Sequence, residues 1–243
     1  MPYGAEHAEL YEKVFLSRGK DFEAEAGSVA GLVRSRFPAA GSLLDVACGT
    51  GAHLEAFQRL FEEVAGVEPA DGMRERAAAR LPGVAVHGDD MRDFDLGRTF
   101  DAVVCLGNSV ACMPDRADLD AAIARMADHL VTGGVLVVEP WWFPGDFIDG
   151  YVDGHVLRDG DRVVSRITRS VRDGDRTRME VRFTVADATG IRDFTEELTV
   201  TLFEREDYVA AFERAGCAVE LVAPLRLDAG RPNGPGLFTG VRK

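Results

Sequence analysis

The first 140 residues alternate between short apolar runs and longer segments whose apolar side chains recur at helical spacing. The runs that predict buried strands are 43–47, 63–68, 84–87, 100–106 and 135–138. The segments that predict helices are 20–37, 52–61, 73–81 and 115–130, the last of them ended by the Thr-Gly-Gly at 132–134. Because strict alternation of strands and helices produces a parallel sheet covered on both faces, this part predicts a doubly wound α/β fold.

After Pro140 the apolar positions recur every second residue. Such alternation marks three stretches, at 162–172, 178–185 and 194–203, with a turn signal at 173–175. It predicts an antiparallel β-meander of about three half-buried strands, inserted into the α/β unit.

The rest of the chain returns to the first pattern. A helix at 206–215 and strands near 218–222 and 237–241 are expected to complete the first sheet. We therefore expect a core made of residues 1–140 and 204–243, with an N-terminal helical lid, and an antiparallel insert at 141–203.

Composition narrows the classes of partner. The 243 residues are 46% hydrophobic, which is enough for a packed core, and 41 acidic against 28 basic residues give a net charge of −13. This balance argues against nucleic acid and anionic membranes as partners. No apolar run reaches the length of a membrane span, no secretion signal is recognisable, and the four scattered cysteines form no pair or zinc motif. We expect a cytoplasmic protein that binds a small molecule and no structural metal.

The turn after the first predicted strand, LLDVACGTGAHL, carries the first candidate chemistry. A dinucleotide-binding turn needs a third glycine where this chain has Leu54, and a phosphate-binding P-loop needs a lysine that is missing. The remaining pattern, Asp45-x-Ala47-x-Gly49-x-Gly51, resembles motif I of class I S-adenosyl-L-methionine (AdoMet) methyltransferases, with Ala47 in place of the first glycine. Small residues let the backbone approach the cofactor's amino-acid part, and the carboxylate is suited to its ammonium group.

Polar groups end the next three strands as well, at the edge where open α/β sheets bind ligands. Glu68 is placed to take the ribose hydroxyls, as an acid does in dinucleotide folds. In the class that motif I resembles, Asp89 and Asp90 would meet the adenine amino group, Met91 the adenine ring, and Leu106 and its neighbours the reacting methyl. Each residue alone also fits a helix cap or the core, but together they predict AdoMet as the cofactor.

These residues say less about the group that accepts the methyl than about the cofactor. Methyl transfer from a sulfonium is an in-line displacement, in which an amine acceptor needs only to be neutral. Asn108 and Ser109 are suited to orient an amine, and the metal-binding cluster of many O-methyltransferases is missing, which weakly favours nitrogen. The released proton goes to water or to a weak base such as His129 or Tyr11, with a structural role as the alternative for His129.

The chain as a whole resembles the N,N-dimethyltransferases that act on dTDP-amino sugars in antibiotic biosynthesis. The resemblance rests on residues 18–22 (RGKDF), the LLDVACGTG turn, residues 88–94 (GDDMRDF) and above all EPWWFP at 139–144. Weaker stretches at 170–172, 177–180 and 236–238 extend it over nearly the full length. It implies an AdoMet-dependent N-methyltransferase that methylates, twice, the amino group of a dTDP-linked deoxysugar. A homodimer is left open.

The resemblance also implies where the substrates bind. An arginine-rich insert fits a diphosphate, and Arg166 and Ser170, which share one strand face, are the first choice for it. Tyr11, Arg18 and Phe22 belong to the lid, where Arg18 and Phe22 would contact the cofactor. The residues expected at the sugar nucleotide are Phe15, Trp141, Trp142, Phe143, Tyr151, Arg166, Ser170, Arg178 and Arg231. The two tryptophans fit a stacking role on thymine and the core equally well.

Three departures from the family pattern leave the acceptor sugar open. Phe15 stands where the family has tyrosine, and Pro235 where it has arginine, a role that Arg231 is a candidate to take over. The stretch 106–109 is more similar to that of glycine N-methyltransferases. The alternatives are therefore a methyltransferase for another small amine or hydroxyl compound, and a non-catalytic AdoMet-binding protein.

Overall fold

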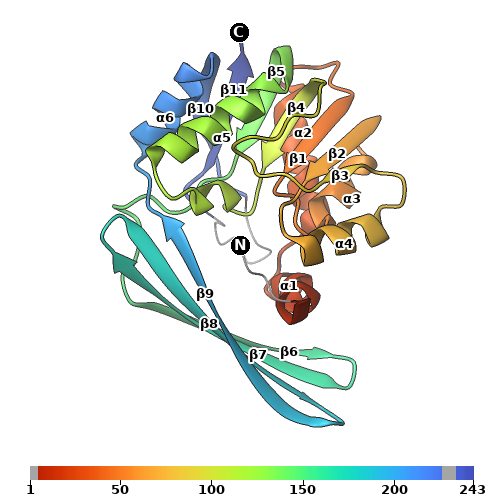
Figure 1. Ribbon diagram of the computed structural model, residues 1–243, viewed down its shortest axis with the longest axis vertical. Helices are drawn as coiled ribbons and strands as arrows, with labels where there is room; N and C mark the ends of the chain where they lie inside the picture. Colours follow the sequence, from red (N-terminus) through yellow and green to blue (C-terminus); the bar gives the residue numbers. More distant parts are fainter. Residues whose placement is uncertain (1–4, 226–233) are drawn as a thin grey trace.

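The computed structural model describes residues 5–225 and 234–243. Its larger sheet has the strand order β10-β11-β5-β4-β1-β2-β3 (Figure 1). Strands β1 to β5 are parallel, and β10 and β11 join the β5 edge in antiparallel orientation. The bounds of the strands are β1 Ser42–Val46, β2 Glu63–Val67, β3 Val86–His87, β4 Phe100–Cys105, β5 Leu130–Val138, β10 Cys217–Val222 and β11 Leu237–Arg242. The expected doubly wound, mostly parallel fold is confirmed.

Helices cover both faces of this sheet. Side chains from α5 and α6 share one core cluster with the sheet, and side chains from α2 and α3 share the other. The helices of this unit are α2 Phe22–Arg34, α3 Ala52–Gln58, α4 Asp71–Arg80, α5 Arg116–Asp128 and α6 Arg205–Arg214, with a short 3-10 helix, η1, at Ser109–Cys112.

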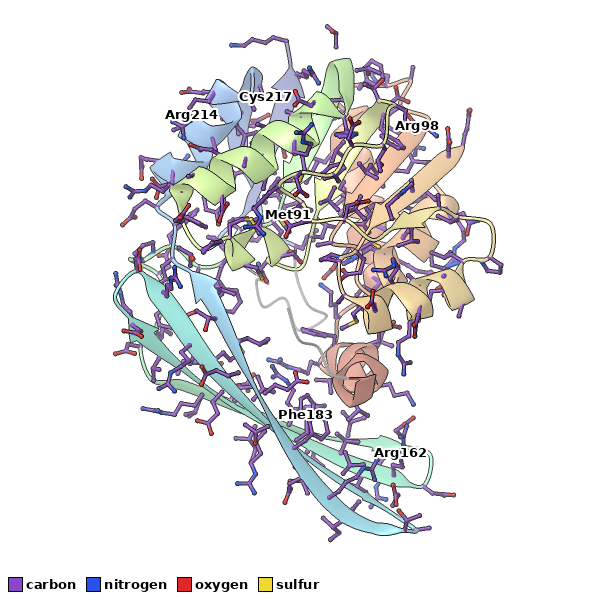
Figure 2. The ribbon with its side chains drawn as sticks, in the orientation of Figure 1. Met91, Arg98, Arg162, Phe183, Arg214 and Cys217 are labelled. Atoms are coloured by element: carbon purple, nitrogen blue, oxygen red, sulfur yellow. The ribbon has the colours of Figure 1, made fainter. Side chains whose placement is uncertain are left out.

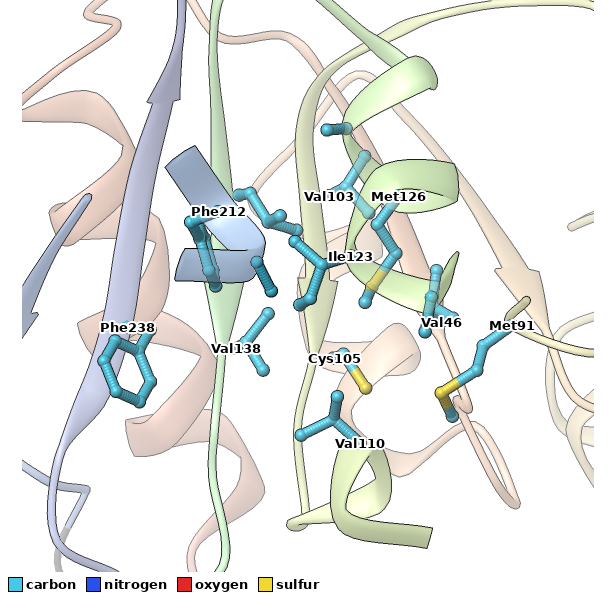
Figure 3. Packing of buried hydrophobic residues seen from close by; sticks show 14 of the residues in the cluster. Val46, Met91, Val103, Cys105, Val110, Ile123, Met126, Val138, Phe212 and Phe238 are labelled. Carbon is cyan, nitrogen blue, oxygen red and sulfur yellow. The ribbon is translucent and has the colours of Figure 1, made fainter. Parts of the chain in front are cut away.

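The central strand β4 shows why its sequence is a continuous apolar run. Val103 and Cys105 belong to the cluster under α5, whereas Ala102 and Val104 belong to the cluster on the opposite face. Figure 3 shows Val103 and Cys105 beside Ile123 of α5. Because both faces of a central parallel strand are covered, every position is selected to be apolar.

The Thr-Gly-Gly at 132–134 lies inside β5, where we expected it to end a helix. Helix α5 already ends at Asp128, and His129 is its C-cap residue. Strand β5 begins at Leu130, and its pairing with β4 shifts register between Phe100 and Ala102. Gly133 has a φ of +82°, a conformation that glycine adopts readily, so the irregular start of the strand is built around this residue.

The second sheet is antiparallel and has four strands, one more than the alternation predicted. Its strands are β6 Tyr151–Asp159, β7 Arg162–Asp173, β8 Arg176–Asp187 and β9 Gly190–Thr201. The strand that was missed is β6, in which the usual alternation is reversed. Val152 and Val156 are about two-thirds exposed, whereas Asp153 and His155 are half-buried. A pattern that assumes buried apolar residues does not detect such a strand.

Helix α1, Ala5–Ser17, lies between the two sheets (Figure 1). Leu10 and Val14 pack into one cluster with Val164 and Phe183 of the antiparallel sheet, and Figure 2 shows Phe183 beside this helix. On its other side, Glu12 accepts a hydrogen bond from the Arg80 guanidinium of α4 at 2.5 Å. Within the described ranges, no helix has the length and apolar character that crossing a membrane requires.

Candidate functional site

A cavity of about 770 Å³ opens at the carboxyl edge of the parallel strands and extends to the inner face of the antiparallel sheet. One side is lined by residues that follow β1, β2 and β4, among them Gly49, Glu68 and Asn108. The other side is lined by Arg166 and Ser170 of β7. The strand order reverses between β1 and β4, so the cavity lies at the switch point where α/β sheets bind ligands.

The motif I turn lines the cavities at this edge of the sheet. Gly49 lines the large cavity and a second one of about 80 Å³ beside it, and has a φ of +58°. Ala47 lines both cavities too, with a φ of 60°, which explains why related turns favour glycine there. Gly51 contributes differently: it is the N-cap of α3, with a φ of +80°, and packs against Ala77 outside both cavities.

Asp45 is the buried acid of this turn. It lines the smaller cavity, and its Oδ2 has no hydrogen-bond partner among the described residues. Burial, together with the negative charge of Glu68, raises the pKa of Asp45 to about 8. An acid in this state gains most from a ligand that brings a positive charge, such as an ammonium group.

Glu68 is fixed by the backbone around it. Its Oε2 accepts the Gly49 N–H at 2.9 Å and its Oε1 accepts the Ala70 N–H at 2.8 Å. Burial raises the pKa of Glu68 even though these two bonds act to lower it. Each carboxylate oxygen keeps a second lone pair, so the group can accept hydroxyl hydrogen bonds in the large cavity that it lines.

The third strand end brings Asp90 and Met91 to the cavity, but not Asp89, which is exposed. Arg92 binds Asp90 through two bonds of 2.8 Å, and this interaction holds the pKa of Asp90 below its usual range. Met91 is buried and contributes an apolar wall. The lone buried carboxylate, the backbone-held acid and the apolar wall fit an ammonium, a ribose and an adenine in that order, which are the parts of AdoMet.

The stretch after β4 lies between the two cavities and lines both. Asn108 has a φ of 62°, and its Nδ2 donates to the carbonyl oxygen of Pro140 at 2.6 Å. The Ser109 hydroxyl donates to the Leu106 carbonyl oxygen at 3.0 Å. These bonds use the hydroxyl donor of Ser109 and one of the two amide donors of Asn108, and the side-chain oxygens of both residues are suited to accept from an amine N–H. Leu106 lines the smaller cavity.

His129 does not take part in this site, and its candidacy as a base is wrong. The Leu96 N–H donates to its Nε2 at 3.1 Å, and its Nδ1 contacts the Arg125 carbonyl oxygen at 2.8 Å. Its own carbonyl accepts the N–H of Phe100, the first residue of β4, so it lies at the edge of the sheet opposite the cavity. It is the C-cap residue of α5, which agrees with the structural role that was the alternative for His129.

Two of the expected substrate contacts are also wrong. Phe143 lies outside both cavities and packs against the rings of Tyr208 and Phe238, in the core. Arg178 lies on the outer face of β8, where it is half-exposed and pairs with Glu197 at 3.2 Å. Alternation correctly separated the two faces of these strands, but it did not say which face turns inward.

The other expected residues are brought together around the cavity. Its lining includes Phe15, Arg18, Trp141, Trp142, Tyr151, Arg166 and Ser170. Phe22 lines the smaller cavity, and Arg18 pairs with Asp153 of β6. The inner face of β7 carries Thr168 and Ser170, both buried, while Ile167 on the outer face is 58% exposed. Arg231 and the side chain of Tyr11 lie outside the described residues.

The sequence reasoning missed a buried charged cluster at the smaller cavity. Lys20 Nζ and His53 Nε2 both contact Oε2 of Glu25, at 2.7 and 2.8 Å. Lys20 stands inside the RGKDF stretch and Glu25 inside a predicted helix, but helical periodicity treats charged positions as exposed. Only the packing of α2 against α3 brings the three side chains together.

Comparisons with known proteins agree with this geometry. Residues 43–134 match the family described as "Methyltransferase domain". The dTDP-4-amino-2,3,4,6-tetradeoxy-D-glucose N,N-dimethyltransferase of Saccharopolyspora spinosa is 51% identical over 99% of this chain and 94% of its own length. The dTDP-3-amino-3,4,6-trideoxy-alpha-D-glucopyranose N,N-dimethyltransferase of Streptomyces venezuelae is 50% identical over 98% of this chain and 99% of its own.

A solved structure extends the comparison to a bound cofactor. The SAM-bound amino pentose methyltransferase CalS10 from Micromonospora echinaspora, involved in calicheamicin biosynthesis, has a TM-score of 0.88 and 50% identity. The match covers 96% of this chain and 97% of that one. The similarity therefore includes the antiparallel sheet as well as the cofactor-binding unit.

Proposed function

Because the chain belongs to the AdoMet-dependent dTDP-amino-sugar N,N-dimethyltransferases, we propose that it dimethylates the amino group of a dTDP-linked amino-deoxysugar. The observation that carries this proposal is the single cavity shared by the cofactor edge and the inner face of β7. Arg166, Thr168 and Ser170 line it opposite the motif I turn. A guanidinium and two hydroxyls beside each other suit a diphosphate, because guanidinium binds phosphate oxygens in pairs.

The aromatic residues of the cavity support a nucleotide ligand. Trp141 and Trp142 line it, and the buried indole N–H of Trp141 has no protein partner among the described residues. A buried donor without a partner is costly, and a bound ligand with an acceptor removes that cost. An apolar ring face and a donor on the same side chain suit a thymine base or a sugar.

Bound AdoMet supplies the electrophilic methyl group, and the chain supplies alignment. In this proposal the side-chain oxygens of Asn108 and Ser109 accept from the substrate amine N–H groups and direct its lone pair toward the cofactor edge. Desolvation in the cavity favours the neutral amine, which is the nucleophilic form. With His129 held by the backbone elsewhere, the released proton leaves through the cavity to solvent.

The proposal is tested by incubating the enzyme with AdoMet and dTDP-amino sugars, and by following the mass of the sugar nucleotide. We expect products that carry one and then two additional methyl groups. Parallel reactions with 3-amino and 4-amino sugars decide the ring position, because relatives act at either one. A protein that binds AdoMet but methylates none of these nucleotides would contradict the proposal.

A further inference from the structure

The smaller cavity, next to the motif I turn, is lined by an acidic and a basic side chain. Asp45 and Lys20 both line it, together with Gly49 of the turn. The side chain of Lys20 is only 6% exposed. We propose that Lys20 binds the α-carboxylate of the methionyl group of AdoMet, and that Glu25 and His53 hold the Lys20 ammonium in position.

The side chains that line the smaller cavity complement the charges of the methionyl group of AdoMet. The methionyl end of AdoMet is a zwitterion, and the unpartnered carboxylate oxygen of Asp45 fits its ammonium group. The carboxylate of the same zwitterion needs a cation close by. Among the described residues that line the smaller cavity, Lys20 is the only lysine or arginine. Arg18 and Arg92 line the large cavity only, where each is paired with an aspartate.

Contacts with neighbouring side chains hold the Lys20 ammonium in position. Glu25 Oε2 takes one N–H of the ammonium at 2.7 Å, which leaves two donors of this group to be directed elsewhere. His53 Nε2 contacts the same oxygen at 2.8 Å and lines the smaller cavity as well. The Lys20 ammonium also lies 5.4 Å from the centre of the Phe22 ring. The side chain is thus fixed from two directions beside the cavity.

The cost of this arrangement points to a ligand. Burying an ion pair usually stabilises a fold no more than an apolar replacement of similar size does. Oε1 of Glu25 is buried and has no partner in the part of the chain that the structure describes, so Glu25 meets the ammonium through Oε2 alone. Burial lowers the pKa of His53, which favours a neutral ring that leaves Glu25 paired chiefly with Lys20. A negative ligand at Lys20 gives the buried ammonium a second partner.

Binding calorimetry with two ligands tests the proposal without any amino sugar, so its outcome does not depend on the acceptor. S-adenosylmethionine is compared with decarboxylated S-adenosylmethionine, which keeps the ammonium and the sulfonium. Wild-type protein should bind the decarboxylated ligand about ten- to hundredfold more weakly, as for the loss of a charge-assisted contact. Equal affinity of the wild-type protein for the two ligands would overturn the proposal.

Lys20→Met should reduce the affinity for S-adenosylmethionine by a similar factor and leave that for the decarboxylated ligand within about twofold. Lys20→Arg should restore part of the difference between the ligands, and Glu25→Gln should reduce it. Lys13→Met is the matched control, since Lys13 pairs with Asp159 outside both cavities. A Lys20→Met protein that loses affinity for both ligands equally would show a purely structural role.

Discussion

The buried carboxyl group of Asp45 has a cost to the stability of the fold that depends on pH. Its pKa is raised to about 8, so between about pH 4 and pH 8 the folded protein holds a proton that the unfolded chain has released. The free energy of unfolding of the cofactor-free protein therefore falls as the pH rises through this range. Asp45→Asn removes this dependence. We expect the variant to be more stable than wild type at pH 8, by roughly 1–3 kcal/mol, and to bind AdoMet much more weakly.

Urea denaturation at pH 5.5 and pH 8 measures the first effect, and calorimetry measures the second. The stability gained by Asp45→Asn should be larger at pH 8, because the ionised carboxylate is then the form being replaced. Glu68 is present in both proteins, so the difference between them reports Asp45 together with its electrostatic interaction with Glu68. A variant less stable than wild type at pH 8, or one with unchanged AdoMet affinity, would contradict this interpretation.

Ala47 is strained by its backbone conformation. Its φ of 60° is unfavourable for a residue with a Cβ, and the related motif has glycine at this place. Ala47→Gly should raise the free energy of unfolding by about 0.5–1 kcal/mol and keep methyl transfer, because the turn is unchanged. Thermal denaturation and a turnover assay check the two statements. Ala65→Gly is the control: this buried β2 residue has no positive φ, so the substitution should destabilise.

Among the elements, the two faces of β7 and β8 separate side chains that line the cavity from surface charges. Arg166→Met should raise the Michaelis constant for the sugar nucleotide about tenfold or more, through loss of a charge-assisted contact, with a smaller change in kcat. Arg178→Met is the matched control, because Arg178 pairs with Glu197 on the outer face. Its Michaelis constant should stay within about twofold of wild type. Equal effects of the two substitutions would contradict the assignment.

The predictability of the elements follows from how each one is buried. Strands β1, β2 and β4 are covered on both faces or nearly so, and their apolar runs were therefore recognisable. Strand β6 was not, because it exposes valines and turns Asp153 and His155 inward. The inner polar face of β7 has the same origin: it faces a ligand cavity instead of a core. An interpretation of alternation assumes that the inward face of a strand packs on an apolar core. It therefore fails for a strand whose inward face lines a cavity.

The residues of the candidate site also differ in whether the sequence could predict them. The cavity-lining residues at the strand ends could be predicted because chain order places them after consecutive parallel strands. The Lys20, Glu25 and His53 cluster could not, since it depends on how α2 packs against α3. Likewise, the positions of His129 and Phe143 follow from tertiary packing, in a helix cap and in the core.

For the whole molecule, α1 connects the two halves of the cavity. Leu10 packs with the antiparallel sheet, and Glu12 contacts Arg80 of the cofactor-binding unit. Val14 and Phe15 line the cavity from the same helix. A ligand that contacts α1 from either side stabilises its docked position, so we expect the second ligand to bind more tightly once the first is bound.

This arrangement predicts reciprocal coupling between the two ligands. S-adenosylhomocysteine should tighten the binding of dTDP, and dTDP that of S-adenosylhomocysteine, by the same factor of about 3–10. Leu10→Ala should reduce the coupling toward one, because Leu10 is 1% exposed and anchors α1 to the antiparallel sheet. Leu16→Ala, on the same helix but at a residue 53% exposed, should leave it unchanged. Titration of each ligand by calorimetry with and without the other measures the factor, and independent binding in the wild-type protein would show that α1 does not connect the two halves.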